Sequence, residues 1–376
     1  MNKTLIFVIN VDWYFRLHWL ERANHFKSLG YNVHIITNFL DSSIENELIS
    51  MGFTCHQFSV KRKSLNLFRE LVSIWHLKYL LKMINPDLIH CVTIKPNIYT
   101  GLINRFFIKK PIIYSITGLG AVFSSSSLKF VIIKRIITLF YKNISVHYSR
   151  FIFENSEDCS LFQDLAIIKN GNGIVIKGAG IDLNRFTSSP LPCDQSILFA
   201  ARLLKEKGLQ CLIEAKTILV KRGCEFTLNV AGIIDNDVSS AISIRQIEIW
   251  AKNGDINWLG NVKDMPSLIK KNDIVCLPTT YGEGVPRILI EAASCQRAIV
   301  TTDVAGCREI VSHGFNGLLA IPADAISLAN CLQELLDNKD KLRKFGINGR
   351  KKVETEFSQE MVFEKTLQVY DELLLS

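Results

Sequence analysis

The residues best suited to chemistry lie in the stretch TTYGEGVPRILIEAASC, residues 279–295. An apolar run at residues 273–278 comes just before it and predicts a short buried strand that a proline closes. Gly282 and Gly284 then predict a tight loop, and a helix is expected to begin just after Pro286. A strand, a glycine loop and a helix N-terminus together predict an anion-binding site at the carboxyl end of the strand.

Two carboxylates frame this predicted site. Glu283 lies on the loop, and Glu291 follows in the helix. Carboxylates do not bind phosphate, but they accept hydrogen bonds from the hydroxyls of a sugar or a ribose. The alternative is that Glu283 is a solvated loop residue and that Glu291 forms an ion pair with Arg287 one turn earlier.

Composition describes an ordinary globular chain that is long enough for two domains. It has 376 residues, of which 48% are hydrophobic and 21% are charged. The ten cysteines form no CxxC pair, so we expect reduced structural thiols in a cytosolic protein. Asp12 and Arg16 follow the apolar start too soon for a signal peptide, and no apolar stretch reaches the roughly 20 residues of a membrane span.

The positive charge is concentrated in the first half of the chain. Residues 1–185 hold 22 Lys and Arg against 12 Asp and Glu, whereas the remainder holds 22 against 24. Residues 101–150 carry eight basic side chains and no acidic one, which favours phosphate-bearing or membrane-surface partners over a merely solvated face. Within them, residues 128–142 predict an apolar, basic helix that either dips into lipid headgroups or packs as a core helix with its lysines reaching out.

Alternating strands and helices are expected in both halves, which makes the fold class α/β. The chain opens with a strand at 5–9, a helix at 15–29 and a strand at 33–37, and its clearest linker is 187–194. The first turn, residues 10–15, contains no glycine. The dinucleotide-binding fingerprint is therefore missing, which argues against a nicotinamide or flavin enzyme.

Two more loops with polar residues follow predicted strands, at residues 93–97 and 117–120. Because both lie at carboxyl ends of strands, we expect their side chains and amides to face one cleft and to bind an anionic group. The residues concerned are Lys95, Thr117, Gly118 and Gly120. The alternative is that the glycines only form turns and that the lysine is only solvated.

Asp235 and Asp237 are spaced closely enough to hold a divalent cation against a diphosphate. No third ligand is evident in the sequence, so a polar turn is the favoured interpretation and no metal site is predicted.

Three motifs, GEGVPRILIEA, ARLLKEKG and TTDVAGCREIV, resemble the donor-binding half of family 4 glycosyltransferases with the GT-B fold. The first half resembles the branch of that family that adds a sugar to polyprenyl-diphosphate-linked saccharides, in the motifs VDWYFRLH, HCVTIKPNIYTGL, SITGLG, KGAGIDLNRF and LGNVKDMPSLI. The resemblance implies two Rossmann-like, doubly wound domains facing a central cleft. Residues 1–188 would bind the acceptor, with the C-terminal helix 358–376 crossing back to them, and residues 189–357 would bind the nucleotide sugar.

The resemblance also implies roles for single residues. Arg202 and Lys207 would hold the donor diphosphate, Glu291 the ribose hydroxyls and Glu283 the donor sugar. The other residues expected at the donor are Val262, Gly282, Gly284, Val285 and Pro286, and the acceptor would be bound by Lys95, Thr117, Gly118 and Gly120. Many relatives carry a histidine where this chain has residues 117–120, so His18 is predicted as a local substitute, with a packed histidine as the alternative.

The predicted function is that of a retaining hexosyl- or N-acetylhexosaminyltransferase. It would move a sugar from a nucleotide-diphosphate sugar, with a UDP-sugar favoured, to a polyprenyl-diphosphate-linked saccharide in O-antigen, lipopolysaccharide, capsule or related glycan assembly. No cofactor, metal or nucleic acid is expected. The chain would lie in the cytoplasm, peripherally on an anionic membrane surface at the inner face of the plasma membrane.

Two alternatives remain. A sugar-nucleotide epimerase on the same architecture needs only the donor and leaves the basic face without a role. The second alternative is a catalytically inactive binding subunit, but the presence of both glutamates with Arg202 and Lys207 argues against it.

Overall fold

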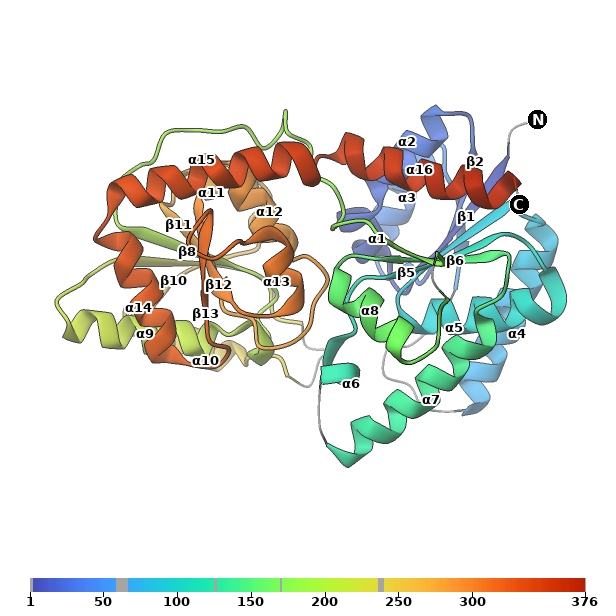
Figure 1. Cartoon of the computed structure of the whole chain (residues 1–376), viewed down its shortest axis with the longest axis horizontal. Coiled ribbons are helices and arrows are strands. Elements are labelled where there is room, and N and C mark those ends of the chain that lie inside the picture. The colour runs from blue at the N-terminus through green and yellow to red at the C-terminus, as the bar shows by residue number, and fades with distance from the viewer. Residues whose placement is uncertain (1–2, 59–66, 125–126, 170, 236–239, 376) are drawn as a thin grey trace. The chain divides into compact units, whose positions relative to one another are not determined.

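The computed structural model describes residues 3–58, 67–124, 127–169, 171–235 and 240–375 (Figure 1). The chain divides into two compact units. The first comprises Met1–Ala179 and Val362–Ser376, and the second comprises Gly180–Met361.

The described part of the first unit contains a seven-stranded sheet in which all the pairings are parallel. The strands, in their order across the sheet, are β3 (Thr54–Gln57), β2 (Asn32–Thr37), β1 (Thr4–Val8), β4 (Leu88–Val92), β5 (Ile112–Ile116), β6 (Ser149–Phe153) and β7 (Gly173–Val175). The chain builds one side of this order outward from β1 and the other side outward from β4. The order therefore reverses between β1 and β4, where open α/β sheets bind their ligands.

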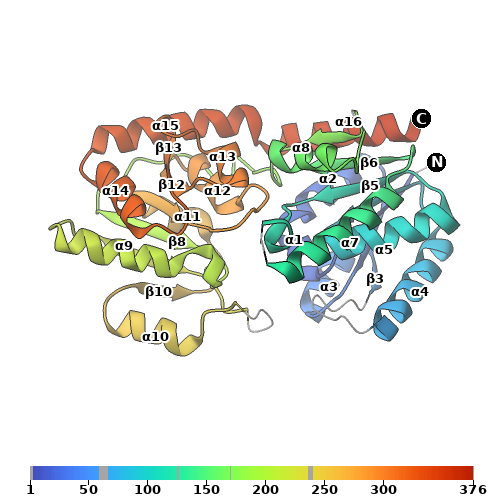
Figure 2. The ribbon, with the colours of Figure 1, turned by 60° about the horizontal axis from the view of Figure 1, so that its bottom comes forward.

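Helices cover both faces of this sheet (Figures 1 and 2). They are α1 (Asp12–His18), α2 (Leu20–Ser28), α3 (Ser42–Ser50), α4 (Leu67–Ile84), α5 (Ile94–Ile103), the π-helix η1 (Asn104–Ile108), α6 (Gly120–Ser124), α7 (Leu128–Ile144), α8 (Ser156–Asp164) and α16 (Gln359–Leu375). Alternation along β1 explains the two cores. Leu5 and Phe7 enter one apolar cluster, and Ile6 and Val8 enter the other on the opposite face.

The last helix, α16, packs into the first unit. Val362, Phe363, Val369, Tyr370 and Leu373 are buried in the same cluster as Leu5 and Phe7. Figure 1 shows α16 running along α2, and the rings of Phe26 and Tyr370 lie 4.6 Å apart between them. The end of the chain is thus part of the core of the unit in which the chain begins.

The second unit holds a six-stranded parallel sheet in its described residues. The strands, in order across the sheet, are β10 (Asn257–Gly260), β9 (Thr227–Ala231), β8 (Ser196–Ala200), β11 (Ile274–Leu277), β12 (Ala298–Thr302) and β13 (Gly317–Ala320). The helices are η2 (Lys205–Lys207, a 3-10 turn), α9 (Leu209–Lys221), α10 (Ile244–Lys252), α11 (Met265–Lys270), α12 (Arg287–Ser294), α13 (Ala305–Ile310), α14 (Ala325–Leu336) and α15 (Lys339–Glu356). Here the order reverses between β8 and β11.

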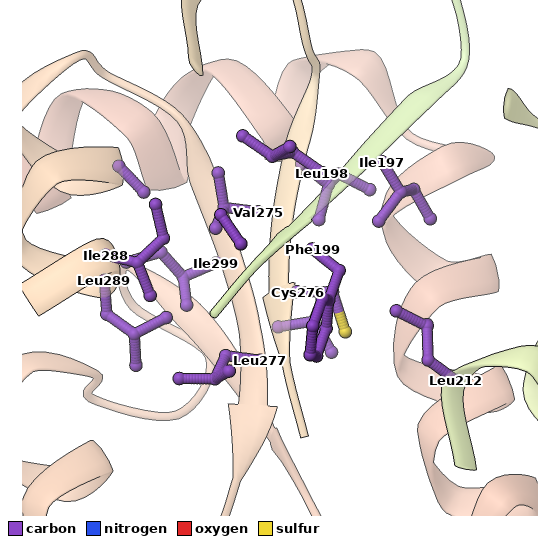
Figure 3. Close-up of a cluster of buried hydrophobic side chains, with 14 of the residues drawn as sticks. Ile197, Leu198, Phe199, Leu212, Val275, Cys276, Leu277, Ile288, Leu289 and Ile299 are labelled. Atoms are coloured by element: carbon purple, nitrogen blue, oxygen red, sulfur yellow. The ribbon is translucent and has the colours of Figure 1, made fainter. Parts of the chain in front are cut away.

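A fully apolar core fixes β8, β11 and α12 against one another. Figure 3 shows Phe199 of β8 and Cys276 of β11 on one side of the sheet, and Ile288 and Leu289 of α12 on the other. Strands buried on both faces read as continuous apolar runs, which is why the sequence predicted them.

Two predictions about local structure in the first unit were wrong. The helix expected at residues 15–29 is two helices, because Trp19 leaves the helical conformation (φ −124°, ψ −17°) and packs its ring against Phe7 and His90. His18 consequently lies in the last turn of the short helix α1. Residues 93–97 do not form a loop either, since α5 begins at Ile94.

Candidate functional site

The candidate site of the second unit lies at the carboxyl ends of β8 and β11, at the point where the strand order reverses. Arg202 and Lys207 follow β8, and the loop with Glu283 follows β11. The neighbouring positions of these two strands therefore bring together residues that are 76 apart in the sequence.

Backbone contacts tie the two loops to each other. The carbonyl of Glu206 accepts a hydrogen bond from the amide of Thr280 at 2.8 Å, and the hydroxyl oxygen of Thr279 lies 3.2 Å from the same carbonyl oxygen. Gly208 has φ +82°, and a Cβ there would lie 2.0 Å from the carbonyl oxygen of Pro278. Only glycine allows this approach, so the residue after Lys207 must be one.

Lys207 and Glu283 form a buried ion pair between these loops. The Lys207 side chain is 11% exposed and that of Glu283 is 15% exposed, and Nζ donates to Oε2. The hydroxyl of Thr279 donates to Glu283 Oε1 at 2.6 Å, and Lys207 Nζ lies 5.5 Å from the centre of the Tyr281 ring. Burial by itself would lower the pKa of Lys207, but the charges of Glu283 and Tyr281 outweigh it and leave that pKa raised. Lys207 is therefore protonated at neutral pH, and it lies beside the glycine loop.

Arg202 forms a second ion pair at the same edge of the sheet. Its Nη1 lies 2.9 Å from Oδ2 of Asp235, in the connection after β9, and the arginine side chain remains 32% exposed. Asp235 thus serves as an anion partner for arginine. Asp237, the second aspartate considered as a metal ligand, lies outside the described residues.

Glu291 is buried in α12 and pairs with Arg287 of the same helix, Nε to Oε1 at 2.8 Å. The ion pair that spacing allowed is therefore present. It fixes the carboxylate near the N-terminal half of α12, which begins after the N-cap residue Pro286.

The loop with Glu283 is also pressed against α13. A Cβ on Gly306 would lie 1.8 Å from the carbonyl oxygen of Gly284, so the two backbones touch. Val285 is buried in the core beneath the loop. Val262, in the connection between β10 and α11, packs at the edge of the same core.

The first unit contains a pocket of about 340 Å³. It is lined by Asn10, Thr93, Ile94, Lys95, Asn97, Ser115, Ile116, Thr117, Gly118, Leu119, Gly120, Val122 and Tyr141. The four residues predicted to face one cleft, Lys95, Thr117, Gly118 and Gly120, therefore line one pocket. It lies at the carboxyl ends of the adjacent strands β1, β4 and β5, beside the reversal in strand order.

Lys95 is an ion-paired residue of that pocket. Its Nζ lies 2.9 Å from Oε1 of Glu70 on α4, and the hydroxyl of Tyr99 donates to the other carboxylate oxygen. His18 is not among the lining residues, and its ring lies 4.5 Å from that of Tyr14 in the same helix.

The sequence did not single out several residues that the structure brings to these sites. In the second unit they are Thr279, Tyr281 and Gly306, and in the first unit they are Asn10, Thr93 and Asn97. Their positions directly after predicted strands were a usable signal for all of them except Gly306 and Asn97.

The described residues contain no group of three or more His, Cys, Asp and Glu side chains arranged to hold a metal ion. Across the same residues, every helix is too short or too polar to span a lipid bilayer.

Two family models match the chain. The model for glycosyl transferases group 1 matches residues 184–352, and the glycosyl transferase 4-like model matches residues 4–152. The chain is 27% identical over 343 residues to N,N'-diacetylbacillosaminyl-diphospho-undecaprenol alpha-1,3-N-acetylgalactosaminyltransferase of Campylobacter jejuni, covering 87% of this chain and 88% of that protein. It is 25% identical over 328 residues to the capsular polysaccharide biosynthesis glycosyltransferase CapM of Staphylococcus aureus, covering 85% of each.

Solved structures share the fold along the whole chain. Anabaena Alr3699/HepE in complex with UDP superposes with a TM-score of 0.79 at 17% identity, covering 99% of this chain and 100% of that one. The sucrose-phosphate synthase of Thermosynechococcus elongatus superposes with a TM-score of 0.79 at 19% identity, with the same coverage. With two parallel α/β sheets of this order and both halves matched by glycosyltransferase models, the chain belongs to the family 4 glycosyltransferases of the GT-B fold.

Proposed function

We propose that the chain transfers a sugar from a nucleotide-diphosphate sugar, with a UDP-sugar favoured, to a polyprenyl-diphosphate-linked saccharide during the assembly of a surface polysaccharide such as O-antigen or capsule, with retention of anomeric configuration. The Campylobacter relative is named for a diphospho-undecaprenol substrate, and the Staphylococcus relative for capsule synthesis. The HepE structure is a complex with UDP. These relatives are transferases, which favours transfer over the epimerase alternative.

The observation that carries this proposal is the pairing of cations and carboxylates where the strand order of the second unit reverses. Lys207 and Arg202 are suited to neutralise the donor diphosphate and to stabilise the charge that builds on it as the bond to the sugar breaks. Glu291 and Glu283 are suited to accept hydrogen bonds from ribose and sugar hydroxyls. Gly282, Gly284, Val285, Pro286 and Val262 complete the proposed donor site.

The acceptor is proposed to bind in the pocket of the first unit, at Lys95, Thr117, Gly118 and Gly120. His18 is retained as a candidate catalytic group in that unit. The acceptor hydroxyl would attack the donor sugar on the face from which the diphosphate leaves, which gives retention.

A surface of exposed apolar and basic side chains in the first unit supports a lipid-linked acceptor. Helix α7 exposes Leu128, Ile132, Ile136, Leu139 and Phe140 along one stripe. Helix α4 exposes a second stripe made of Phe68, Leu71, Val72, Trp75, Tyr79 and Met83, and η1 adds Phe106 and Phe107. We call these residues the amphipathic surface.

The parts of the amphipathic surface are neighbours. Helix α5 contacts both α4 and α7, and Figures 1 and 2 show the three helices side by side. Lys78 of α4 lies 3.4 Å from the centre of the Phe107 ring. Exposed basic side chains, among them Lys82, Lys109, Lys129, Arg135 and Lys142, surround the apolar stripes. Apolar side chains among cations suit the headgroup layer of an anionic bilayer, such as the inner face of a plasma membrane.

The test of the donor half is a panel of nucleotide sugars screened by thermal unfolding, followed by transfer assays on a polyprenyl-diphosphate saccharide with and without EDTA. A donor at 100 times its dissociation constant should stabilise the protein by about 2.7 kcal/mol. Glu291→Gln should lose this stabilisation, and Glu248→Gln, at an exposed position on α10, should keep it. Conversion of the donor to an epimer without acceptor, or strict dependence on Mg²⁺, would contradict the proposal.

A further inference from the structure

Thr279 lies at the base of the glycine loop, directly after Pro278 at the carboxyl end of β11, and it is fully buried. The hydroxyl of Thr302 on β12 donates to its backbone carbonyl. The amide of the next residue, Thr280, donates to the carbonyl of Glu206 in η2 at 2.8 Å. Contacts with β12 and with η2 therefore hold the backbone at Thr279 in one place.

The buried hydroxyl of Thr279 has two acceptor oxygens within reach. Glu283 Oε1 lies 2.6 Å from its Oγ1, and the carbonyl oxygen of Glu206 lies 3.2 Å from it. A hydroxyl carries one hydrogen, and the carboxylate is both the nearer and the charged acceptor, so the hydrogen bond goes to Glu283. A charge-assisted bond of this length is among the stronger hydrogen bonds in proteins.

Glu283 lies on a loop whose backbone does not determine where its carboxylate points. Gly282 and Gly284 flank it, and the packing of Gly306 against this loop fixes the course of the chain. A glutamate side chain has three torsions with several staggered positions, so a fixed backbone still allows many positions of the carboxylate. A donor on a rigid part of the fold is what selects one of them.

Lys207 Nζ also donates to this carboxylate, but the same lysine is proposed to meet the donor diphosphate. Its ammonium group lies at the end of a flexible four-carbon stem, and phosphate oxygens compete with Glu283 for it. Thr279 is different, because a ligand cannot reach a fully buried hydroxyl. The bond from Thr279 therefore persists when the lysine is shared with a diphosphate.

We infer that Thr279 is a positioning residue for the transfer reaction: its buried hydroxyl holds the carboxylate of Glu283 in the orientation that accepts hydrogen bonds from the donor sugar. Thr279 itself touches no ligand. The inference rests on the proposed function and adds a residue outside the predicted donor site. Its consequence is that loss of this hydroxyl affects recognition of the sugar and spares recognition of the nucleotide and of the acceptor.

The experiment compares variants of the full-length protein. Thr279→Val keeps the size and β-branching of the side chain and removes only the hydroxyl, whereas Thr279→Ser keeps the hydroxyl. Thr279→Ala serves in place of the valine variant if that one does not fold. Thr366→Val is the matched control, because Thr366 is also fully buried and its hydroxyl donates to a backbone carbonyl of α16 at 2.7 Å. Glu283→Ala, alone and combined with Thr279→Val, tests whether Thr279 acts through the carboxylate.

Binding is measured by isothermal titration calorimetry without acceptor, for a panel of UDP-, GDP- and TDP-sugars and for the matching nucleoside diphosphates. We expect Thr279→Val to weaken binding of the nucleotide sugar on the order of tenfold and to leave binding of the nucleoside diphosphate unchanged. Thr279→Ser and Thr366→Val should bind both ligands nearly as the wild type does. In the Glu283→Ala protein, adding Thr279→Val should not weaken the nucleotide sugar further. In transfer assays Thr279→Val should lower kcat and leave the KM for the acceptor unchanged.

Four results would overturn the inference. Thr279→Val binds the nucleotide sugar as the wild type does, it loses the nucleoside diphosphate to the same extent, Thr279→Ser is as weak as Thr279→Val, or the effect persists in the Glu283→Ala protein. A wild type that binds no nucleotide sugar would overturn the inference together with the donor site. Failure of the proposed function differs from these results, because the variants then bind nucleotide sugars as expected but no sugar reaches the polyprenyl-diphosphate saccharide.

Discussion

At the scale of single residues, the candidate donor site is a set of charges that already have partners. Lys207 pairs with Glu283, Arg202 with Asp235, and Glu291 with Arg287. A ligand must therefore exchange or share these partners on binding. The pairs also mean that substitutions here alter stability as well as ligand binding.

Lys207→Ala should abolish transfer and also destabilise the protein without ligand, because it leaves the carboxylate of Glu283 buried without its cation. Breaking a buried pair costs about 3–5 kcal/mol at most sites, and some exposure at this one makes the lower end the expectation. Adding Glu283→Gln should restore most of the lost stability and none of the activity. Urea unfolding of the two single variants and the double variant measures this coupling. An unchanged unfolding midpoint in Lys207→Ala would show that the pair does not form in solution.

At the scale of elements, the loop after β11 is shaped by its neighbour α13. The backbone contact between Gly306 and Gly284 leaves no room for a side chain. The position of Glu283 thus depends on the packing of its loop against Gly306.

Gly306→Ala should push the loop away and lower the transfer rate on the order of 100-fold, since a shift of about 1 Å in a catalytic group has effects of that size. The cost in stability should be about 1–3 kcal/mol. Gly349→Ala on α15 is the control, because its Cβ would meet only Ala293, with the Cβ of Ala293 at 3.3 Å and the Cα at 3.5 Å. Both variants are compared by steady-state kinetics and thermal unfolding, and equal kinetics would refute the steric argument.

A buried polar chain joins α16 to the sheet of the first unit. His90 Nδ1 lies 2.5 Å from Tyr370 Oη on α16, and its Nε2 lies 2.7 Å from Ser115 Oγ. Burial, and next the charge of Arg22, hold the pKa of His90 well below its usual value. His90 therefore stays neutral in the folded protein at mildly acid pH.

The sign of the pH dependence follows from this shift. Below about pH 6.5 the unfolded chain binds a proton at His90 that the folded protein does not, so stability falls as the pH falls. From pH 6.5 to 5.5 this residue should contribute a loss of about 1 kcal/mol, which His90→Gln should remove. Burial raises the pKa of Asp158 to about 6, so as the pH falls the folded protein binds a proton at this carboxyl more readily than the unfolded chain does. This stabilises the fold at lower pH by the same amount in the wild type and in His90→Gln. Urea unfolding at both pH values tests the prediction, with exposed His76→Gln as the control; equal slopes in His90→Gln and wild type would disprove it.

At the scale of the whole molecule, charge is unevenly divided along the chain. The eight basic residues of 101–150 lie partly on the amphipathic surface, among exposed apolar side chains of α4, η1 and α7. Apolar contact and charge attraction would act together at one face of the first unit.

Replacing Lys129, Lys134 and Arg135 by glutamate should release the protein from anionic liposomes, because each nearby basic residue contributes on the order of 1 kcal/mol before screening. Wild-type binding should weaken as salt rises. The matched control replaces Lys339, Lys344 and Lys351 by glutamate, and it should still bind anionic liposomes. These three exposed lysines lie on α15 in the other unit. Liposome sedimentation makes the comparison, and a wild type that ignores anionic liposomes at low salt would remove the main physical support for membrane docking.

The sequence by itself predicted several of the strands, among them 5–9, 33–37 and 273–278, and showed that polar residues follow predicted strands. It did not predict β6, β7 or β13. The apolar runs before residues 117–120 and 279–286 are long enough to read without a structure, because strands buried on both faces need no alternation. It also determined the uneven charge and the glycine loop with its two glutamates. These are local properties, and each can be read from a short window of residues.

Only the tertiary structure decided which strand ends are neighbours. That β1 lies beside β4, and β8 beside β11, depends on packing across the whole sheet, so the pairing of Lys207 with Glu283 was beyond any local pattern. Packing also causes the helix to break at Trp19, which leaves His18 in the last turn of a short helix. Burial of that ring against Phe7 and His90 outweighs the modest free energy that a continuous helix would gain.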